Sequence, residues 1–205
     1  MHNRKKKIKK IQLTIKRGFD IAVSTLGLLI LSPVLLVTAA LIKITMPGKV
    51  FFRQERVGKN KKIFHILKFR TMKEDKKAEQ AHDFSKDSER MTKTGMILRR
   101  LKIDELPQLL NVLAGDMSLV GPRPTVIEQV RNYNKFQLRR LKMRPGMTGL
   151  AQVNGNTALD WDERIVFDVK YVENFSLWMD LMILLKTILV VVCGEQKFKK
   201  ECEKY

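Results

Sequence analysis

The sequence is poor in cysteine. Its 205 residues include only Cys193 and Cys202, both close to the C-terminus. Neither lies at a spacing typical of a disulfide framework or a zinc site. We therefore expect two free thiols in a reducing compartment.

Acidic residues are also scarce, since 21 Asp and Glu stand against 40 Lys and Arg and leave a formal net charge of +19. Such an excess predicts an anionic partner, which is a nucleic acid, an anionic lipid or a phosphorylated substrate. Charge alone does not choose among the three. The length suits one soluble domain with its own core, together with one apolar segment.

Charge is absent from the segment between Ile21 and Ile42. Its length is close to the ~20 residues that cross a bilayer as a helix. A helix in a soluble core should carry its polar residues on one face, but here they share no face. These residues are Ser24, Thr25, Gly27, Ser32 and Thr38. The run is about twice as long as the apolar part of a secretory signal and has no cleavage pattern. We therefore place the segment in lipid.

Both flanks of this segment are basic, and cytoplasmic ends of membrane segments carry an excess of Lys and Arg. A straight span cannot leave both ends in the cytoplasm. A helix broken at Ser32-Pro33 can, because proline removes one backbone hydrogen bond and clashes with the preceding turn. The Ser32 hydroxyl is placed to bond a carbonyl freed there. A re-entrant hairpin is one interpretation, and a proline-kinked span is the alternative.

The rest of the chain predicts a mixture of short strands and helices. VFFRQERVG and IFHILKFRTM, separated by Gly58-Lys59-Asn60, are typical of two strands joined by a turn. The polar stretch 73–93 indicates a mobile surface loop. A 3.6-residue period places Leu106, Leu109, Leu110 and Leu113 on one helix face, ended by Ala114-Gly115.

Three more helices are predicted further along, at 125–143, 162–171 and 177–192. The last is apolar but contains Asp180 and Lys186, which favours an interfacial helix over a second span. The expected fold class is thus α/β, mostly helical with few short strands.

Asp104-Glu105 is the first candidate for chemistry. One interpretation is structural, because Asp is a preferred N-cap and acidic residues favour a helix N-terminus. The other is a phosphate and metal site, because Arg99, Arg123 and other cations lie close in sequence. One acid would then attack phosphorus while the other holds Mg²⁺, which prefers hard oxygen ligands.

Other candidates are weaker when taken alone. The two prolines of Gly-Pro-Arg-Pro at 121–124 stiffen the backbone around Arg123, which suits a bidentate grip on phosphate, although an ordinary turn is the alternative. Lys68 and Arg70 lie on one side of an extended segment with Phe69 on the other, either as a phosphate grip or as a solvated strand face. Asp168 by itself is indistinguishable from a surface acid.

Taken together, the motifs resemble a known family. They are KFRTM, LRRLKIDELPQLLNVLAGDMSLVGPRP, RPGMTGLAQVNG and DVKYVENFSLWMDLMILLKT. In this order, from Lys16 to about Glu195, they are similar to the bacterial sugar transferases, small monotopic polyprenol-phosphate phosphoglycosyl transferases.

The resemblance implies transfer of a sugar-1-phosphate from a UDP-sugar to undecaprenyl phosphate with release of UMP, an initiating membrane step of bacterial glycan biosynthesis. It implies Asp104 as a nucleophile that forms an aspartyl-phosphosugar intermediate and Glu105 as a Mg²⁺ ligand. Lys68, Arg99, Arg123 and Asp168 match residues that support the site or hold phosphate. It also implies a Ser-Pro re-entrant helix, and a location at the cytoplasmic face of the bacterial inner membrane.

The expected organisation has four parts. They are a basic segment 1–17, a re-entrant helix 18–46 broken at Ser32-Pro33, a cytoplasmic catalytic domain 47–195 and a tail 196–205. The expected partners are a UDP-sugar, undecaprenyl phosphate and membrane lipids, without nucleic acid, and a homo-oligomer is compatible with the sequence. The sugar and the glycan pathway are left open.

One position departs from the family pattern. Many members carry an Arg after the Asn-Gly of this motif, where it contacts phosphate, but this chain has Asn156, which supplies no cation. Two rival functions are a membrane-tethered module that binds nucleic acid or anionic lipid without catalysis, and a catalytically inactive scaffold. The first lacks any helix-turn-helix, RNP or zinc pattern, and the intact acid pair speaks against the second.

Overall fold

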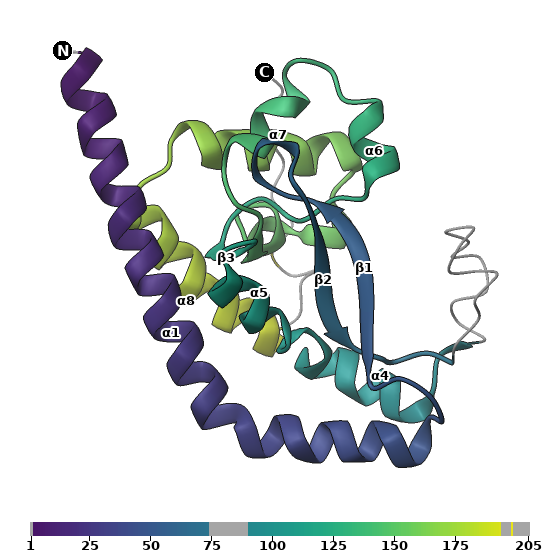
Figure 1. Ribbon diagram of the computed structural model, residues 1–205. Coiled ribbons are helices and arrows are strands. Elements are labelled where there is room, and N and C mark those ends of the chain that lie inside the picture. The colour runs from purple at the N-terminus through teal and green to yellow at the C-terminus, as the bar shows by residue number, and fades with distance from the viewer. Residues whose placement is uncertain (1, 74–89, 194–197, 199–205) are drawn as a thin grey trace.

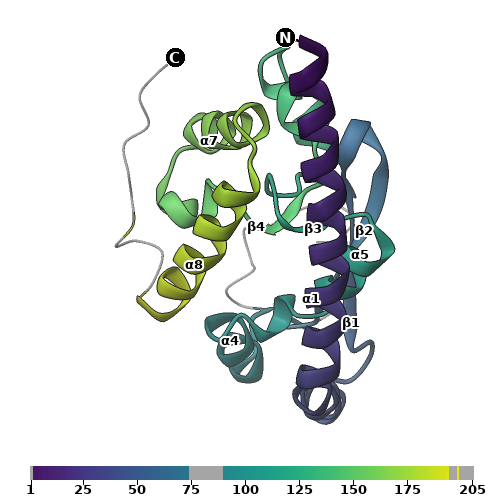
Figure 2. The same ribbon diagram turned by 90° about the vertical axis from the view of Figure 1, so that its left-hand side faces the viewer.

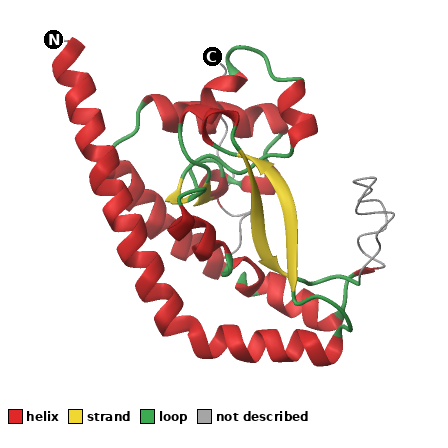
Figure 3. Ribbon diagram, in the orientation of Figure 1, coloured by secondary structure: helices red, strands yellow, loops and turns green. Residues whose placement is uncertain are grey.

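The computed structural model describes residues 2–73, 90–193 and 198. Helices dominate, with two short sheets among them (Figure 3). The α-helices are α1 (His2–Thr45), α4 (Lys93–Arg100), α5 (Gln108–Ala114), α6 (Ile127–Arg131), α7 (Trp161–Glu173) and α8 (Leu177–Cys193). The strands are β1 (Phe51–Val57), β2 (Ile63–Phe69), β3 (Ser118–Val120) and β4 (Gly146–Thr148). The predicted loop at 73–93 and the tail lie mostly outside the described residues.

The helix α1 is long and bent. It runs down one side of the molecule and then turns beneath α4 (Figure 1). Its one internal proline is Pro33, which cannot donate to the carbonyl of Leu29 four residues earlier. The Ser32 hydroxyl donates to that carbonyl at 2.8 Å, as the sequence predicts. Residues Ile8–Thr45 are long and apolar enough to cross a membrane, and only 11% of their most apolar stretch is buried.

Charged side chains fasten the first half of α1 to the rest of the protein. Lys16 Nζ lies 2.6 Å from Asp180 of α8, with both side chains nearly buried. Asp20 accepts hydrogen bonds from the Ser118 hydroxyl and the Leu119 backbone N–H of β3. In the view turned by 90°, α8 and α1 lie on either side of β3 and β4 (Figure 2). The first half of α1 is therefore tied to α8 and β3.

The strands β1 and β2 form an antiparallel hairpin, as predicted, with Phe51 opposite Phe69 and Val57 opposite Ile63. Asn60 and Lys61 have positive φ in the turn, a conformation that Asn tolerates better than most residues. Strand β3 pairs in parallel with β4. Only glycine fits at position 121, just after β3, because a Cβ there would lie 2.4 Å from the Arg144 carbonyl oxygen.

Two helix predictions need correction. The leucine-rich helix α5 is shorter than predicted, because the residues before Pro107 form a separate turn. It buries Leu109, Asn111 and Val112, whereas Leu110 is exposed. Gly115 ends it with φ 87°, as predicted. The predicted helix over 125–143 is wrong in its middle.

That region contains α6 and a separate 3₁₀ helix, Gln137–Lys142. Between them the side chains of Asn134 and Gln137 each bond the other residue's backbone N–H, at 2.9 and 3.0 Å. Such side-chain to backbone bonds compete with helix continuation.

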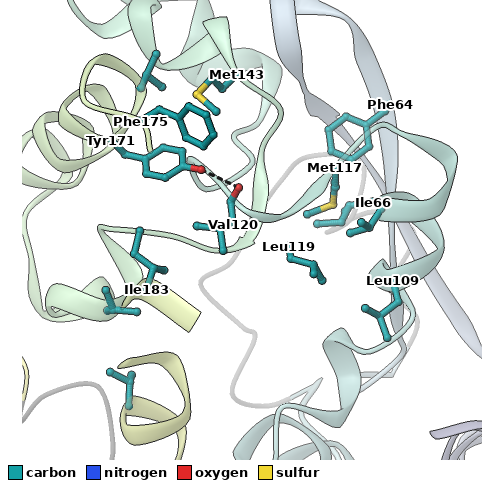
Figure 4. Close-up of a cluster of buried hydrophobic side chains, with 14 residues drawn as sticks. Phe64, Ile66, Leu109, Met117, Leu119, Val120, Met143, Tyr171, Phe175 and Ile183 are labelled. Carbon is teal, nitrogen blue, oxygen red and sulfur yellow. Dashed lines mark hydrogen bonds between the residues drawn. The ribbon is translucent and has the colours of Figure 1, made fainter. Parts of the chain in front are cut away.

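The main core joins the hairpin to α5, β3, α7 and α8. Buried side chains from these elements include Ile66, Leu109, Leu119 and Ile183 (Figure 4). Tyr171 of α7 is fully buried in this core, and its hydroxyl lies 2.7 Å from Asp180 Oδ1 and 3.2 Å from the Val120 carbonyl oxygen. Because β2, α5 and β3 share this core, the segments that follow each of them are held in fixed relative positions.

Candidate active site

The acid pair lies on a tight turn between α4 and α5. Residues Ile103–Glu105 form a 3₁₀ turn after Lys102, which adopts the left-handed conformation at φ 57°. Pro107, not Asp104, takes the N-cap position of α5. The interpretation of Asp104 as the cap of that helix is therefore wrong, which leaves its carboxylate available for another role.

Glu105 is paired with Lys68 of β2, a contact that the sequence motifs did not predict. Glu105 Oε1 lies 2.6 Å from Lys68 Nζ, and their side chains are 30% and 23% exposed. Burial by itself would raise the pKa of Glu105, but Lys68, Arg123 and Lys102 outweigh burial and hold that pKa below its ordinary value. Glu105 is thus a charged carboxylate at the edge of solvent.

Asp104 has a different environment although it is the adjacent residue. It is 7% exposed, and its Oδ1 has no hydrogen-bond partner within the described part of the chain. Burial and the neighbouring Glu105 raise the pKa of Asp104, while Lys68, Arg99 and Lys102 lower it to a smaller extent. A buried carboxylate oxygen without a partner is a costly arrangement, and such groups mark candidate sites of chemistry.

The predicted cation Arg99 lies on α4 and acts on Asp104 through its charge. Its Nε donates to the Thr71 hydroxyl at 3.0 Å. Arg70 is the other cation of the KFRTM motif. It is buried and donates to the carbonyls of Met46 and Pro47, so it anchors the segment that follows α1. This contact differs from both predicted roles, a phosphate grip and a place on a solvated strand face.

A small cavity opens beside Glu105 and Lys68. It is about 40 Å³ in volume, and we call it the acid-pair cavity, although of the two acids only Glu105 lines it, and Asp104 precedes Glu105 on the same turn. Its wall includes Arg123, as the Gly-Pro-Arg-Pro motif predicts. Other lining residues were not expected from the sequence, namely Arg56, Gln108, Met147 and Gln152.

A second cavity of about 140 Å³ adjoins the first and shares Arg56, Arg123 and Pro124 with it. We call it the Asp168 cavity. Asp168 of α7 lines it and forms an ion pair with Arg140 in which the side chains are 1% and 2% exposed. Burial raises the pKa of Asp168 to about 6, although the Arg140 guanidinium lowers it. Asp168 therefore lies beside the acid-pair cavity and not among its lining residues.

Contacts between the cavities fix Arg123. Arg140 donates to the Arg123 carbonyl at 2.9 Å, and Arg123 itself donates to Asn156 Oδ1 at 3.1 Å. Asp168 is thus linked to Arg123 through Arg140, and the Arg123 backbone also lowers the pKa of Asp168 directly. Asn156 supplies no charge, but its side-chain oxygen orients the Arg123 guanidinium.

Within the described residues, no group of three or more His, Cys, Asp and Glu side chains surrounds a common point. A fully protein-built metal site is therefore absent from this part of the chain. Mg²⁺ is commonly held differently, by one or two carboxylates together with substrate phosphates and water. Asp104-Glu105, with one unpartnered buried oxygen, fits that mode.

The sequence also matches known proteins. Residues 11–194 match the family described as bacterial sugar transferase. An uncharacterized sugar transferase EpsL of Bacillus subtilis is 42% identical over 183 residues, which cover 89% of this chain and 90% of that protein.

Two relatives have more specific names. The UDP-N-acetylgalactosamine-undecaprenyl-phosphate N-acetylgalactosaminephosphotransferase of Aeromonas hydrophila is 44% identical, over 88% of this chain and 44% of that protein. The UDP-glucose:undecaprenyl-phosphate glucose-1-phosphate transferase of Escherichia coli is 42% identical, over 85% of this chain and 39% of that protein. The chain spans less than half the length of these two relatives.

Proposed function

The chain belongs to the bacterial sugar transferase family, and on that premise we propose that it transfers a sugar-1-phosphate from a UDP-sugar to undecaprenyl phosphate and releases UMP. The observation that carries the proposal is the acid pair on its turn, with Lys68 on Glu105 and Arg123 in the adjoining wall. Carboxylates among fixed cations suit phosphoryl transfer, where positioning and charge neutralisation supply most of the catalysis. The names of two relatives state the same substrates.

Asp104 is the nucleophile of this proposal. Its carboxylate oxygen attacks the phosphorus that bears the sugar, and the bond from that phosphorus to the bridging oxygen breaks. UMP leaves with the bridging oxygen and its electron pair. A phosphate oxygen of the lipid acceptor then attacks the same phosphorus, the aspartyl–phosphorus bond breaks, and the Asp104 carboxylate is restored. Covalent catalysis of this kind replaces one difficult displacement by two easier ones.

Glu105 is the proposed Mg²⁺ ligand. Bound there, the ion would neutralise charge on the diphosphate of the donor. Lys68 keeps Glu105 ionised, which a carboxylate ligand requires. Removal of divalent ions with EDTA should abolish UMP release, and added Mg²⁺ should restore it. Full activity in excess EDTA would contradict this role of Glu105.

The membrane part of the proposal is that α1 enters the inner leaflet and returns to the cytoplasmic side. Its bend, the Ser32 bond to Leu29 and the basic residues at both ends support a hairpin. Glycosylation tags placed at the N-terminus and after the last described helix should report the same side. Tags on opposite sides would contradict the hairpin.

The outer faces of three helices support a seat in the membrane. Large apolar side chains exposed there include Ile30, Leu36 and Ile44 of α1, Met96 and Ile97 of α4, and Trp178, Leu185, Ile188 and Val192 of α8. Exposed apolar surface of this extent is typical of contacts with a membrane or another protein. A site held near the headgroups would meet a water-soluble donor and a lipid phosphate together.

The experiment that tests the function is an assay of UMP release by the purified full chain in detergent, with a panel of UDP-sugars. We expect one or a few UDP-sugars to give UMP and a polyprenol-linked product when undecaprenyl phosphate is present. Absence of turnover with every sugar tested would contradict the proposal. The panel would also identify the sugar.

A further inference from the structure

Arg56 is a cation at the junction of the two cavities that the motifs do not single out. Alternate residues of β1 face inward, and this places Arg56 on the same side of the strand as Gln54, opposite the exposed Arg53. The next residue, Val57, donates its backbone N–H to the Thr125 carbonyl at 2.9 Å. That link joins the end of β1 to the segment that carries Arg123.

Arg56 and Arg123 both line the acid-pair cavity and the Asp168 cavity. Neither forms an ion pair with a carboxylate within the described residues. The contacts of Arg56 are with neutral oxygens, Gln54 Oε1 at 2.5 Å and the Pro124 carbonyl at 3.4 Å, and its buried Nε has no partner there. Burial and the charge of Arg123 lower the pKa of Arg56 to about 10, although Glu128 and Glu105 raise it.

The other cations of the two cavities are already engaged. Lys68 is paired with Glu105 and Arg140 with Asp168. Arg164 donates to backbone carbonyls, including that of Leu159 at 2.7 Å. Two like charges held side by side, neither bonded directly to a carboxylate, are unfavourable until an anion lies between them. The junction is therefore built for an anion that the protein itself does not supply.

We propose that Arg56 and Arg123 form one phosphate site, which holds the phosphate of the leaving nucleotide and then the phosphate of the lipid acceptor. The assignment rests on the proposed function. Attacking and leaving oxygens lie roughly in line across the transferred phosphorus. If one carboxylate serves both displacements, the group that leaves and the group that later attacks occupy the same place opposite that carboxylate. Guanidinium pairs are suited to this exchange because they grip phosphate oxygens in a bidentate fashion.

The first test measures UMP binding to the purified full chain by calorimetry, which needs no turnover. Arg56→Gln should raise the Kd for UMP by about 10- to 100-fold, the usual loss for a hydrogen-bonded charge contact. Arg56→Lys keeps the positive charge but lacks the paired N–H donors of the guanidinium, so it should raise the Kd for UMP by less. The matched control is Arg53→Gln on the exposed side of the same strand, whose Kd should stay within about twofold of the wild type.

The second test asks whether the two phosphates share the site. Undecaprenyl phosphate in detergent should displace UMP competitively from the wild type, and Arg56→Gln should raise the KM for donor and acceptor alike. Circular dichroism and thermal unfolding identify any variant that fails to fold, and Arg56→Lys then serves in its place. Simultaneous binding of UMP and undecaprenyl phosphate would overturn the shared site.

The outcomes separate this inference from the function on which it rests. A wild type that turns over while Arg56 variants keep normal affinity for UMP and acceptor would overturn the inference alone. A wild type that binds UMP through Arg56 but transfers no sugar-phosphate would overturn the proposed function alone. A wild type that neither binds UMP nor releases it from any UDP-sugar would overturn both.

Discussion

The two adjoining cavities each hold a carboxylate bonded to a cation, but they differ in their contact with solvent. The Glu105 and Lys68 side chains are 30% and 23% exposed, whereas those of Asp168 and Arg140 are 1% and 2% exposed. The pKa of Glu105 falls below its ordinary value, and burial raises that of Asp168 to about 6. In the Asp168 cavity, burial raises the carboxylate pKa by more than the cation lowers it. In the acid-pair cavity, the cations lower the pKa of Glu105 by more than burial raises it.

The difference in exposure and in carboxylate pKa indicates separate roles for the two pairs. The acid-pair cavity keeps an ionised carboxylate near the surface, where substrate phosphates and a metal ion can reach it. The Asp168 cavity contains a buried ion pair that holds Arg123 through its backbone carbonyl. Substitutions of Asp104, Glu105 or Lys68 should therefore change rates, and substitutions of Asp168 or Arg140 should mainly change stability.

The largest effect is expected for Asp104→Asn. The amide cannot serve as the nucleophile, so UMP release should fall by about 10³-fold or more. The fold should persist, because Asp104 Oδ1 makes no hydrogen bond in the described chain. The measurement is UMP release with thermal unfolding of the same sample. Asp116→Asn, which alters only an exposed contact with Lys62, is the control, and turnover retained by Asp104→Asn would remove Asp104 from this role.

Next in size is the effect of Asp168→Ala on stability. The change leaves the buried Arg140 charge without its carboxylate, which typically costs about 3–5 kcal/mol of unfolding free energy. Thermal unfolding in detergent should show a clear fall in Tm. Glu173→Ala breaks the half-exposed pair with Arg139 and should cost about 1 kcal/mol or less. Equal shifts in the two variants would show that burial does not separate the pairs.

Asp168→Asn isolates the effect of the raised pKa. The pKa of Asp168 is about 6 in the fold against 3.8 as the ordinary value, so the folded protein binds this proton more tightly. That contribution to stability is complete below the ordinary value and is lost as pH rises through about 6, and it amounts to no more than about 3 kcal/mol. Unfolding measured between pH 4 and pH 7 should show a smaller decline in Asp168→Asn. An unchanged pH slope would contradict the raised pKa.

The smallest effect is expected for Lys68→Gln. Without the Lys68 charge the pKa of Glu105 rises, so the carboxylate is protonated at a higher pH than in the wild type. Activity should then be lost earlier as pH falls, with a deficit of roughly tenfold at the acid end. A pH–rate profile tests this, with Lys62→Gln as the exposed control. Parallel profiles for wild type and Lys68→Gln would mean that Lys68 does not set the charge of Glu105.

Local patterns in the sequence predict much of this fold. The turn residues around Asn60 predict the hairpin, and the helices expected at 162–171 and 177–192 correspond to α7 and α8. The Ser32 bond follows from the carbonyl that Pro33 leaves without a donor. The motifs single out Lys68 and Glu105 as site residues, but the pair that they form is seen only in the structure.

What the sequence does not reveal depends on contacts between distant residues. Arg56 meets Pro124 across 68 positions and Arg140 meets Asp168 across 28, and neither arginine differs in its local setting from a surface cation. The break between α6 and the next turn comes from the reciprocal bonds of Asn134 and Gln137, which helix periodicity does not register.

The most direct test of the central claim is intact-protein and peptide mass spectrometry after incubation with the accepted UDP-sugar and no lipid acceptor. The account predicts an added mass of one sugar-phosphate on the peptide that contains Asp104, absent in Asp104→Asn and lost from the wild type when undecaprenyl phosphate is added. Efficient turnover with no such adduct, or an adduct on another residue, would contradict it.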